Sequence, residues 1–565
     1  AGIRTHSENA MEDLREAMDK LRELSVQPGR SAQARGKGSL ASCSTTHVAP
    51  WLEKVTSFFS SDRASEVTER DLRDILVSLT SIAESGLLDG SSVSSLHTSA
   101  IVSSCKYIRC RSNKISRGIF PEAAQLLAFY GASKRHRKSS RTDIRSIKEV
   151  LKVLLDGVSG GKDLIPSSHL ARLKDTCFGL LSVLMLNHNT KTFIRHQSSM
   201  VVQLVLQILH VIFSEHRSCS EHDIQNFIHF FPKLIQPCCS AASPSHTSQA
   251  IRKNTLGKAD LDTASNKEND KDNTLEHGDE APKSQRYVPP HRRPSASMSG
   301  GGGGETTGSD QSESDLSDLS DAEGVITSEN GLGKVCYITM QTLNAIVSLG
   351  PKALQPHFNV LFPSSQSQSP SGGRECSFSD ANLLTLLSIC RSVRIRILVA
   401  KTICDVLDSS SQQSYLSIAE VNTSGRSGPQ RGFTTLSVSL GNILLNLHSV
   451  LRSLISSPLA MSVPALLAME VRALAAVVQV CPYHRISEPV GVDLMGFMFE
   501  QFGNRLLTKC ASEEQFVASA EDCALISSVI NAFTVIVSKS ELKPHLLTDL
   551  GPSVTSTHST ATQTN

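Results

Sequence analysis

The sequence predicts an all-α fold, an α-solenoid of stacked helical repeats in two arrays separated by a disordered linker. Two observations point to this class. Aromatic residues make up only 5% of the chain, with a single Trp, which suits helices packed through aliphatic side chains better than a sandwich or barrel. Apolar residues recur at spacings of three and four in segment after segment, and nothing strand-like lies between them. A chain of 565 residues is too long for one core, but a repeat array avoids that limit.

The individual helices are indicated by their apolar spacing and their end signals. Residues 8–24 predict a helix whose apolar side chains share one face. After a loop containing Gly and Ser, Thr68 and Asp71 form a capping-box pattern that begins the next helix, which ends at Gly86. The same pattern predicts helices over residues 121–131, 142–157, 169–186, 200–213, 223–235 and 335–349. Each is amphipathic and needs neighbours, as the helices of a solenoid do.

The composition divides the chain into four parts. Residues 241–333 are rich in Ser, Asp, Lys, Asn, Glu and Gly, which is typical of a disordered linker. An N-terminal helical array over residues 1–240 precedes it, and a second helical array over residues 334–540 follows. Residues 541–565 form a tail that we expect to be disordered or truncated. The first residue is Ala rather than Met, which also favours the interpretation that the sequence is a fragment.

Charge and cysteine content narrow the class of protein. The chain has 56 Lys and Arg against 54 Asp and Glu. Its net charge is therefore close to zero, and no overall electrostatic field favours a nucleic-acid or membrane partner. Its 14 cysteines are scattered and no signal peptide precedes them, which predicts reduced thiols in an intracellular protein of the cytoplasm, the nucleus or both. The apolar runs 200–213 and 524–537 are too short for a bilayer, so no transmembrane segment is expected.

Two segments carry a recognisable repeat signature. A short turn leads into a helix that bears an apolar residue followed by Arg and then small apolar residues, at Ile395-Arg396 and at Val471-Arg472. The second segment keeps a small residue at Ala475, where close helix packing requires one. This pattern resembles the HEAT repeat of the armadillo-like helical family, in which the arginine bridges neighbouring repeats. Cys390 stands where that family usually has Asp, so the sequence does not support an Asp to Arg ladder at Arg396.

The order of features from residue 316 to residue 485 resembles that of a family of HEAT repeat-containing proteins. The features are the acidic stretch 320–324, the stretches 393–407 and 415–420, the pairs Phe433-Thr434 and Leu447-His448, and Pro482 to Arg485. Members of that family are much longer, so the resemblance implies that this chain is an N-terminal portion. It also implies an armadillo-like repeat protein without known enzymatic activity.

Motifs for catalysis and cofactors are weak. Residues 157–161 match the nucleophile-elbow pattern around Ser159, but a predicted helix precedes the serine where the elbow needs a strand. A plain glycine loop explains the match better. Lys162 and Lys334 each follow a Gly without the spacing of a phosphate-binding loop. We therefore predict no catalytic residue and no cofactor.

Metal-binding side chains gather between residues 216 and 239. The cluster contains His216, Cys219, His222, His229, Cys238 and Cys239. No Cys-x-x-Cys or His-x-x-x-His pair completes a four-ligand zinc site, so ordinary loop and core residues are the favoured interpretation and no metal is predicted.

A basic run lies between two predicted helices. It consists of Lys134, Arg135, His136, Arg137 and Lys138. The run is typical of a nuclear-import signal or a nucleic-acid patch, and a solvated loop explains it equally well. A second set of cations extends the run if the two lie close in space: Lys106, Arg109, Arg111, Lys114 and Arg117.

The linker carries one compact cluster of aromatic, proline and arginine residues. Its members are Arg286, Tyr287, Val288, Pro289, Pro290, His291, Arg292 and Arg293. The cluster is similar to a short motif in the N-terminal extensions of DEAD-box RNA helicases, and prolines reduce the entropy cost of binding an extended segment. We interpret it as a docking peptide, and a stiff spacer is the alternative.

Four linker serines lie in an acidic setting that an acidophilic kinase would recognise. They are Ser312, Ser314, Ser317 and Ser320, interspersed with Asp and Glu. Phosphorylation of Ser320 would create the acidic determinant for Ser317 and so build a dense negative charge. An acidic solubilising tract is the alternative interpretation.

The leading hypothesis from the sequence is a non-catalytic scaffold that binds other proteins through its helical surfaces and a phosphorylatable linker. The runner-up is a nuclear or RNA-associated adaptor that uses residues 134–138 and 287–293. An enzyme acting through Ser159 is the third and weakest.

Overall fold

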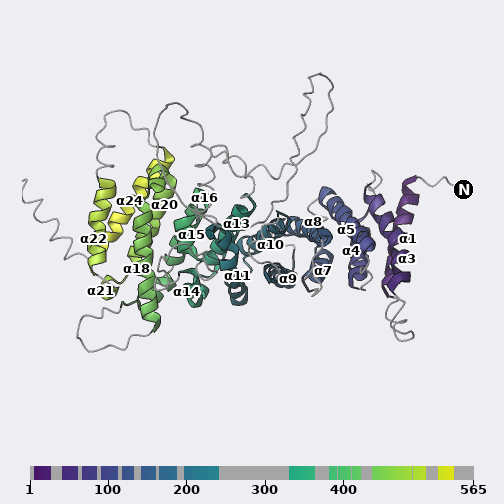
Figure 1. Cartoon of the computed structure of the whole chain (residues 1–565), viewed down its shortest axis with the longest axis horizontal. Helices are drawn as coiled ribbons and strands as arrows, with labels where there is room; N and C mark the ends of the chain where they lie inside the picture. The colour runs from purple at the N-terminus through teal and green to yellow at the C-terminus, as the bar shows by residue number, and fades with distance from the viewer. Residues whose placement is uncertain are drawn as a thin grey trace, which may run out of the picture. The chain divides into compact units, whose positions relative to one another are not determined.

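The computed structural model describes residues 6–26, 41–60, 67–84, 91–111, 117–132, 141–160, 165–186, 196–240, 330–362, 381–390, 392–408, 410–421, 435–486, 488–503 and 519–539. These residues form helices, turns and short connections, and no strand occurs among them. The predicted all-α class is confirmed (Figure 1).

The helices pair along the chain, and each pair contributes one helix to each of two layers. The first layer contains α1 (His6–Val26), α4 (Glu69–Glu84), α7 (Phe120–Ala132), α9 (Ser167–Leu186), α11 (Glu221–Ser240), α15 (Leu383–Ile389), α18 (Thr435–Ile455) and α22 (Glu488–Met498). The second contains α3 (Ala41–Phe59), α5 (Ser91–Arg111), α8 (Arg141–Val158), α10 (His196–Ser214), α13 (Asn330–Leu349), α16 (Val393–Leu407), α20 (Pro464–Val480) and α24 (Ala520–Ser538).

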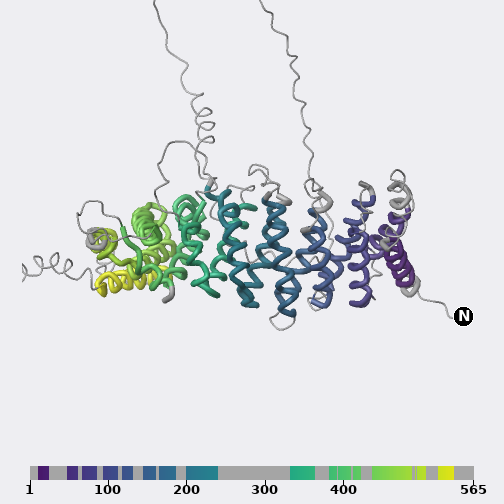
Figure 2. Tube along the Cα trace, turned by 90° about the horizontal axis from the view of Figure 1, so that it is seen from below, coloured from purple at the N-terminus to yellow at the C-terminus, as the bar shows by residue number. Residues whose placement is uncertain are grey.

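Contacts follow the order of the chain within each layer. First-layer helices contact one another in sequence from α1 to α18, and second-layer helices do so from α3 to α24. Within a pair the two helices also contact each other, as α7 and α8 do and as α18 and α20 do. Figure 2 shows the described helices following one another in chain order, from purple near the N-terminus to yellow. One continuous cluster of buried side chains runs from Met11 to Ile536. This arrangement is an α-solenoid, in which each repeat buries its apolar face against its neighbours.

The capping box predicted at the start of α4 is present. The Thr68 backbone NH donates to Asp71 Oδ2 at 3.1 Å, and the Asp71 NH donates to Thr68 Oγ1 at 3.3 Å. A second box of the same kind begins α11, where the Ser220 NH donates to Asp223 Oδ2 at 2.8 Å. Both boxes satisfy backbone donors that a helix start leaves unpaired.

Two helices were missed from the sequence. The region expected to be a Gly and Ser loop contains α3, and α5 lies in a Ser-rich stretch for which no helix was predicted. Frequent hydroxyl residues weaken the helical signal of both segments, and α3 also contains Pro50. Each still buries apolar residues at helical spacing, such as Val48, Leu52 and Val55 in α3. Packing against neighbouring helices decides these segments, because tertiary contacts outweigh local propensity.

Residues 241–329 lie outside the described part of the chain, and the two helices on either side of them pack together. Helix α11 contacts α13, and α13 also contacts α10. Gln203 in α10 donates from Nε2 to the Gly331 carbonyl of α13 at 2.9 Å. The helical segments before and after the predicted linker therefore share one core, and α13 begins at Asn330, inside the predicted linker range of 241–333.

Short elements join the later helix pairs. They are the 3-10 helix η4 (Pro351–His357), α14 (Phe358–Leu361), α17 (Ser410–Leu416), α19 (Pro458–Ser462), α21 (Tyr483–Ile486) and the π-helical turn η7 (Phe499–Gly503). A buried hydrogen bond of 2.9 Å joins Nε2 of His448 in α18 to the Tyr483 hydroxyl of α21. The insertions expected around residues 363–380 and 422–431 lie outside the described residues.

Within the described residues, two helices, α18 and α24, are long and apolar enough to cross a membrane by length and composition. No membrane-spanning segment is predicted from the sequence, in which the apolar run at 524–537 is too short for a bilayer. In α18, half of the most apolar 18-residue segment (the apolar window) is buried inside the protein, which is typical of a core helix. In α24, only 22% of the corresponding segment is buried.

Candidate functional site

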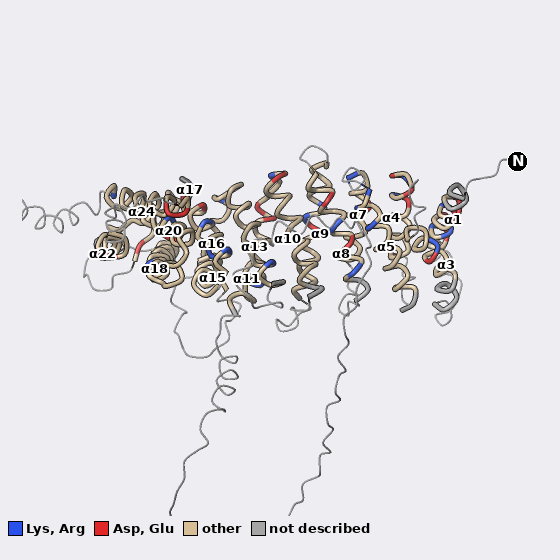
Figure 3. The backbone as a smooth tube through the Cα atoms, turned by 90° about the horizontal axis from the view of Figure 1, so that it is seen from above, with Lys and Arg blue, Asp and Glu red and all other residues tan. Residues whose placement is uncertain are grey.

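Ion pairs connect neighbouring repeats at several points of the described chain. In the first layer, Lys174 Nζ of α9 lies 2.6 Å from Asp223 Oδ2 of α11, and both side chains are buried. In the second layer, Arg109 Nε of α5 lies 2.8 Å from Asp156 Oδ2 of α8. Figure 3 shows basic and acidic residues interspersed along the described helices. The four charges of these two ion pairs stabilise contacts between repeats, so they do not contribute to a binding surface of one sign.

Asp71 shows how one carboxylate serves two elements. It closes the capping box of α4 and also lies 3.3 Å from Arg15 Nε in α1. Burial alone would raise the pKa of Asp71, but the hydrogen bonds from Thr68 and the pairing with Arg15 lower it below the usual value. The aspartate is therefore ionised at neutral pH and joins the first two repeats.

The predicted signature arginine Arg396 is buried and pairs across two repeats. Its Nη2 lies 2.7 Å from Glu470 Oε1, which joins α16 to α20. Burial raises the pKa of Glu470, and the charge of Arg396 opposes that rise. Cys390, which stands where the repeat family has Asp, is buried at the end of α15. The acidic partner of Arg396 therefore lies on α20, and no motif in the sequence singles out Glu470.

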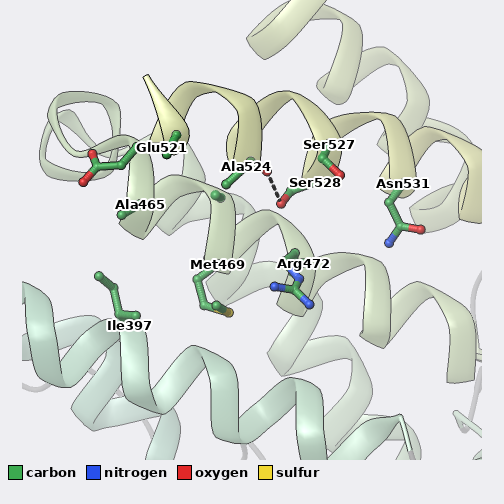
Figure 4. Close-up of a pocket in the computed structure, with 11 residues that line it drawn as sticks. Ile397, Ala465, Met469, Arg472, Glu521, Ala524, Ser527, Ser528 and Asn531 are labelled. Carbon is green, nitrogen blue, oxygen red and sulfur yellow. Dashed lines mark hydrogen bonds between the residues drawn. The ribbon is translucent and has the colours of Figure 1, made fainter. Parts of the chain in front are cut away.

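The second signature arginine, Arg472, lies two residues beyond Glu470 on α20 and is exposed. It lines a cleft of about 800 Å³ between α16, α20 and α24. The lining residues are Ile397, Ala465, Ala468, Met469, Arg472, Ala520, Glu521, Ala524, Ser527, Ser528 and Asn531. Figure 4 shows Ile397, Met469 and Arg472 on α16 and α20, and Glu521, Ser527 and Asn531 on α24. The buried Arg396–Glu470 pair joins α16 to α20, the two helices that carry Ile397, Met469 and Arg472.

Four of the residues that line the cleft are alanines: Ala465, Ala468, Ala520 and Ala524. The Ser528 hydroxyl donates to its own helix at the Ala524 carbonyl, 2.7 Å away. Apolar walls of this kind with a few polar groups are typical of a recognition site.

The charge of Arg472 is not neutralised by an ion pair with any described residue, although acidic and thiol groups lie within reach of its field. Burial raises the pKa of the Cys404 thiol to about 12 and raises the pKa of Asp405, while Arg472 acts in the opposite direction on both. Arg472 is therefore a cation that remains available for an incoming carboxylate.

Three sets of residues singled out by the sequence lie outside the described residues. They are the basic run at 134–138, the docking cluster Arg286 to Arg293 and the acidic-setting serines Ser312 to Ser320. The roles suggested for them stay predictions.

The cations considered as an extension of the basic run are partly occupied. Arg109 pairs with Asp156, and Arg117 donates to the Gly160 carbonyl. The Arg111 guanidinium lies over the Tyr107 ring, 5.2 Å from its centroid. Lys114 lies outside the described residues. Arg109 and Arg117 thus hold structural elements together.

Hydrogen bonds and burial at Ser159 and in the His and Cys cluster are those of ordinary turn and core residues. Ser159 lies in a turn after α8, where its backbone NH donates to the Leu155 carbonyl at 2.9 Å. Nε2 of His216 is hydrogen-bonded to the Val158 carbonyl at 3.0 Å, and burial raises the pKa of Cys219 to about 12. Within the described residues, no three His, Cys, Asp or Glu side chains are placed to hold a metal ion.

Comparison with known proteins adds a family match to the second half of the helical region. A family model described as a domain of unknown function (DUF4042) matches residues 334–506, from within α13 to just beyond η7. The match includes α16 and α20 of the cleft and ends before α24. No curated protein matches the chain.

Among solved structures, the chain is similar to a "Circular tandem repeat protein with novel repeat topology and enhanced subunit contact surfaces". The two share 10% sequence identity over 96% of this chain and 99% of that chain, with a TM-score of 0.21. The α-solenoid of this chain is defined by the contacts among its own helices. Residues 334–506 therefore resemble a domain whose function is unknown.

Proposed function

We propose that this protein is a non-catalytic, HEAT-type scaffold that binds an extended segment of another protein in the cleft between α16, α20 and α24. The observation that carries the proposal is the exposed, unpaired Arg472 in a cleft of about 800 Å³ with walls of small and apolar side chains. Helical-repeat proteins bind partners along surfaces formed by successive repeats, and this cleft lies where three second-layer helices adjoin.

The lining residues suggest the chemistry of the bound segment. Arg472 presents a planar, permanently charged group that fits a carboxylate through two hydrogen bonds. Ile397 and Met469 supply an apolar wall next to it, and Asn531 offers amide groups to a peptide backbone. A segment with an Asp or Glu beside an aliphatic residue meets these requirements best.

Two further elements belong to the proposal as predictions from the sequence. The cluster from Arg286 to Arg293 recruits a second partner, and an acidophilic kinase modifies Ser312, Ser314, Ser317 and Ser320. The alternative is a nuclear or RNA-associated adaptor, and it requires a salt-dependent RNA affinity that is lost when the arginines at 135, 137, 292 and 293 are changed to Ala.

The experiment selects peptides from a displayed library on the full chain and measures their affinity by fluorescence polarisation. The wild type is compared with Arg472→Glu and with Arg172→Glu, a matched charge reversal at an exposed position of α9. We expect Arg472→Glu to weaken binding at least tenfold, since it replaces a charge-assisted contact with a repulsive one. Arg172→Glu should leave the affinity unchanged.

Filling the cleft gives an independent test. Ala524 is exposed in the cleft wall, so Ala524→Trp should block the selected peptides while the helical circular dichroism stays unchanged. Peptides that bind both Arg472→Glu and Ala524→Trp as tightly as the wild type would overturn the proposal.

A further inference from the structure

Two cysteines meet where the helices on either side of residues 241–329 pack together. Cys238 lies in the last turn of α11 and is half-buried, whereas Cys336 lies in α13 and is fully buried. The Cys238 thiol donates to the Leu332 carbonyl at 3.7 Å. Leu332 and Cys336 are four positions apart on α13, so they are neighbours on one face of that helix. The Cys238 sulfur therefore lies against the turn of α13 that carries Cys336.

The two thiols also interact directly. A hydrogen bond with Cys238, together with burial, raises the pKa of Cys336 well above its ordinary value of 9.0. Cys239 and Cys390 act on Cys336 only through their charge, without a hydrogen bond. Cys238 is therefore the nearest partner of Cys336 among the described thiols. A hydrogen bond between thiols brings the two sulfur atoms close together, as the formation of a disulfide requires.

The end of α11 is held less firmly than its middle. Pro237 precedes Cys238 and has no backbone NH to donate to the preceding turn. The helix ends at Ser240, two residues beyond Cys238. Few backbone hydrogen bonds hold this last turn, so the Cys238 sulfur can move towards Cys336 without disturbing the rest of the core.

We propose that Cys238 and Cys336 form a reversible disulfide when the protein meets hydrogen peroxide. Cys238 reacts first, because it is half-buried whereas Cys336 has no exposed surface. Its sulfur loses a proton and attacks one peroxide oxygen, so that the O–O bond breaks. One oxygen stays on Cys238 as a sulfenic acid, and the other leaves with the proton as water.

Cys336 completes the reaction. Its sulfur attacks the sulfenic sulfur of Cys238, the S–S bond forms, and the hydroxyl group leaves with the Cys336 proton as a second water. Two thiols are thereby oxidised to one disulfide, and one peroxide is reduced to two waters. The second step is slow, because a thiol with a raised pKa is mostly protonated and is a poor nucleophile. Two glutathione thiols reverse the reaction and become one glutathione disulfide.

The disulfide changes the joint between α11 and α13. It closes a loop of roughly 100 residues, which constrains the unfolded chain, so the oxidised protein unfolds at a higher temperature than the reduced protein. It also holds the first turns of α13 against α11, which slows hydrogen exchange there. In a reducing compartment such disulfides are transient and serve to sense oxidants. The pair is therefore a site of oxidative modification at the contact between the two helices.

The first test identifies the crosslink in the full chain. The protein is treated with hydrogen peroxide, its remaining thiols are blocked with iodoacetamide, and its peptides are analysed by mass spectrometry without reduction. We expect a peptide pair that joins residues 238 and 336 in the wild type and is lost in Cys238→Ala and in Cys336→Ala. In Cys336→Ala, dimedone should trap the sulfenic acid of Cys238.

The neighbouring thiols supply matched controls. Cys239→Ala and Cys390→Ala each remove a cysteine that acts on Cys336 only through its charge, so both variants should keep the crosslink. Circular dichroism checks that every variant is folded as the wild type is.

The second test measures what the disulfide does to the joint. Oxidation of the wild type should raise the temperature of thermal unfolding and slow exchange of the α13 amides beside Cys336 by at least about threefold. Dithiothreitol should reverse both effects. Peroxide should cause neither effect in Cys238→Ala, and both effects should persist in Cys239→Ala.

The proposal fails if the wild type forms no crosslink between residues 238 and 336 under conditions that oxidise the exposed thiols of Cys110 and Cys523. It also fails if Cys336 pairs with Cys239 instead, or if its only crosslinks join two copies of the chain. Equal unfolding temperatures and equal α13 exchange in the oxidised and reduced wild type would overturn the effect on the joint. The peptide cleft plays no part in the argument for this pair, so either proposal can fail without the other.

Discussion

Helices α18 and α24 have similar length and apolar composition, yet the protein surrounds them differently. Half of the apolar window of α18 is buried, against 22% of the window of α24. The difference comes from neighbours: α18 contacts α15, α19 and α20, whereas α24 contacts α20 and α22. The hydropathy of a helix therefore indicates how much apolar surface it carries. The number of helices that pack against it in the solenoid determines how much of that surface is buried.

We expect that an introduced aspartate costs far more stability in α18 than in α24. Leu444 in α18 is fully buried, and Leu444→Asp places an unpaired charge in the core. We expect the local free energy of unfolding around α18 to fall by more than about 4 kcal/mol. Ile530→Asp in α24 should change the corresponding free energy around α24 by less than about 0.5 kcal/mol, because the site is exposed.

Hydrogen exchange of the α18 and α24 amides measures both effects. Equal losses of protection in the two helices would contradict the contrast drawn from their burial.

Interior and edge also differ in what an ion pair contributes. Removing Glu470 by Glu470→Ala leaves Arg396 buried without its partner, and we expect a loss of about 3–5 kcal/mol in the stability of the α16–α20 region. Arg15→Ala, which breaks the half-exposed pair with Asp71 at the N-terminal repeats, should cost less than about 1 kcal/mol.

The double variant Arg396→Met with Glu470→Leu provides the control for the buried pair. Replacing both charges with apolar groups should recover most of the loss, because the cost arises from the uncompensated charge. A double variant as unstable as Glu470→Ala would show that side-chain packing, and not charge, is responsible.

Helix boundaries could be predicted from the sequence where local end signals and the pattern of buried residues agree. The capping box of Thr68 and Asp71 and the boundaries of most first-array helices follow from end signals and apolar spacing, and these were predicted. Helices α3 and α5 were missed, because their Ser and Thr content conceals apolar residues that only tertiary packing brings into the core.

The candidate site shows where sequence reasoning stops. Arg396 and Arg472 were both identified from one repeat signature, yet one is a buried structural cation and the other lines the cleft. Their difference depends on Glu470, which lies 74 positions from Arg396. No local pattern specifies such a pairing, and the contribution of Ser527 and Asn531 to the cleft likewise depends on how α24 packs on α20.

The interior of α18 also predicts a dependence of stability on pH. Burial, together with the smaller effect of the nearby Arg452 charge, lowers the pKa of His448 from an ordinary value of 6.5 to about 4. The unfolded chain therefore binds a proton at a higher pH than the folded chain does. Stability from this group is complete above pH 6.5 and falls as the pH decreases towards 4, by a total of about 3 kcal/mol.

Urea unfolding between pH 7 and pH 4 measures this loss, with His448→Gln as the control that removes the titrating group. The difference in stability between the two proteins should change with pH over that interval. A constant difference would mean that His448 is protonated alike in the folded and unfolded chains.

The smallest expected effect compares two helical glycines, one in the interior and one at the edge. A Cβ atom added to Gly441 in α18 would meet the backbone of Glu420, whereas one added to Gly496 in α22 meets no atom within 4 Å. Backbone cannot move aside as a flexible side chain can, so Gly441→Ala should destabilise the protein by about 1–3 kcal/mol.

Gly496→Ala should instead stabilise α22 by up to about 1 kcal/mol, because alanine loses less conformational entropy than glycine in a helix. Thermal unfolding of the two variants beside the wild type gives shifts of opposite sign if Gly441 is packed against the backbone of Glu420 and Gly496 faces open space. Stabilisation by both substitutions would mean that the close approach of Glu420 to α18 relaxes without cost, and that the interior tolerates change as readily as the edge does.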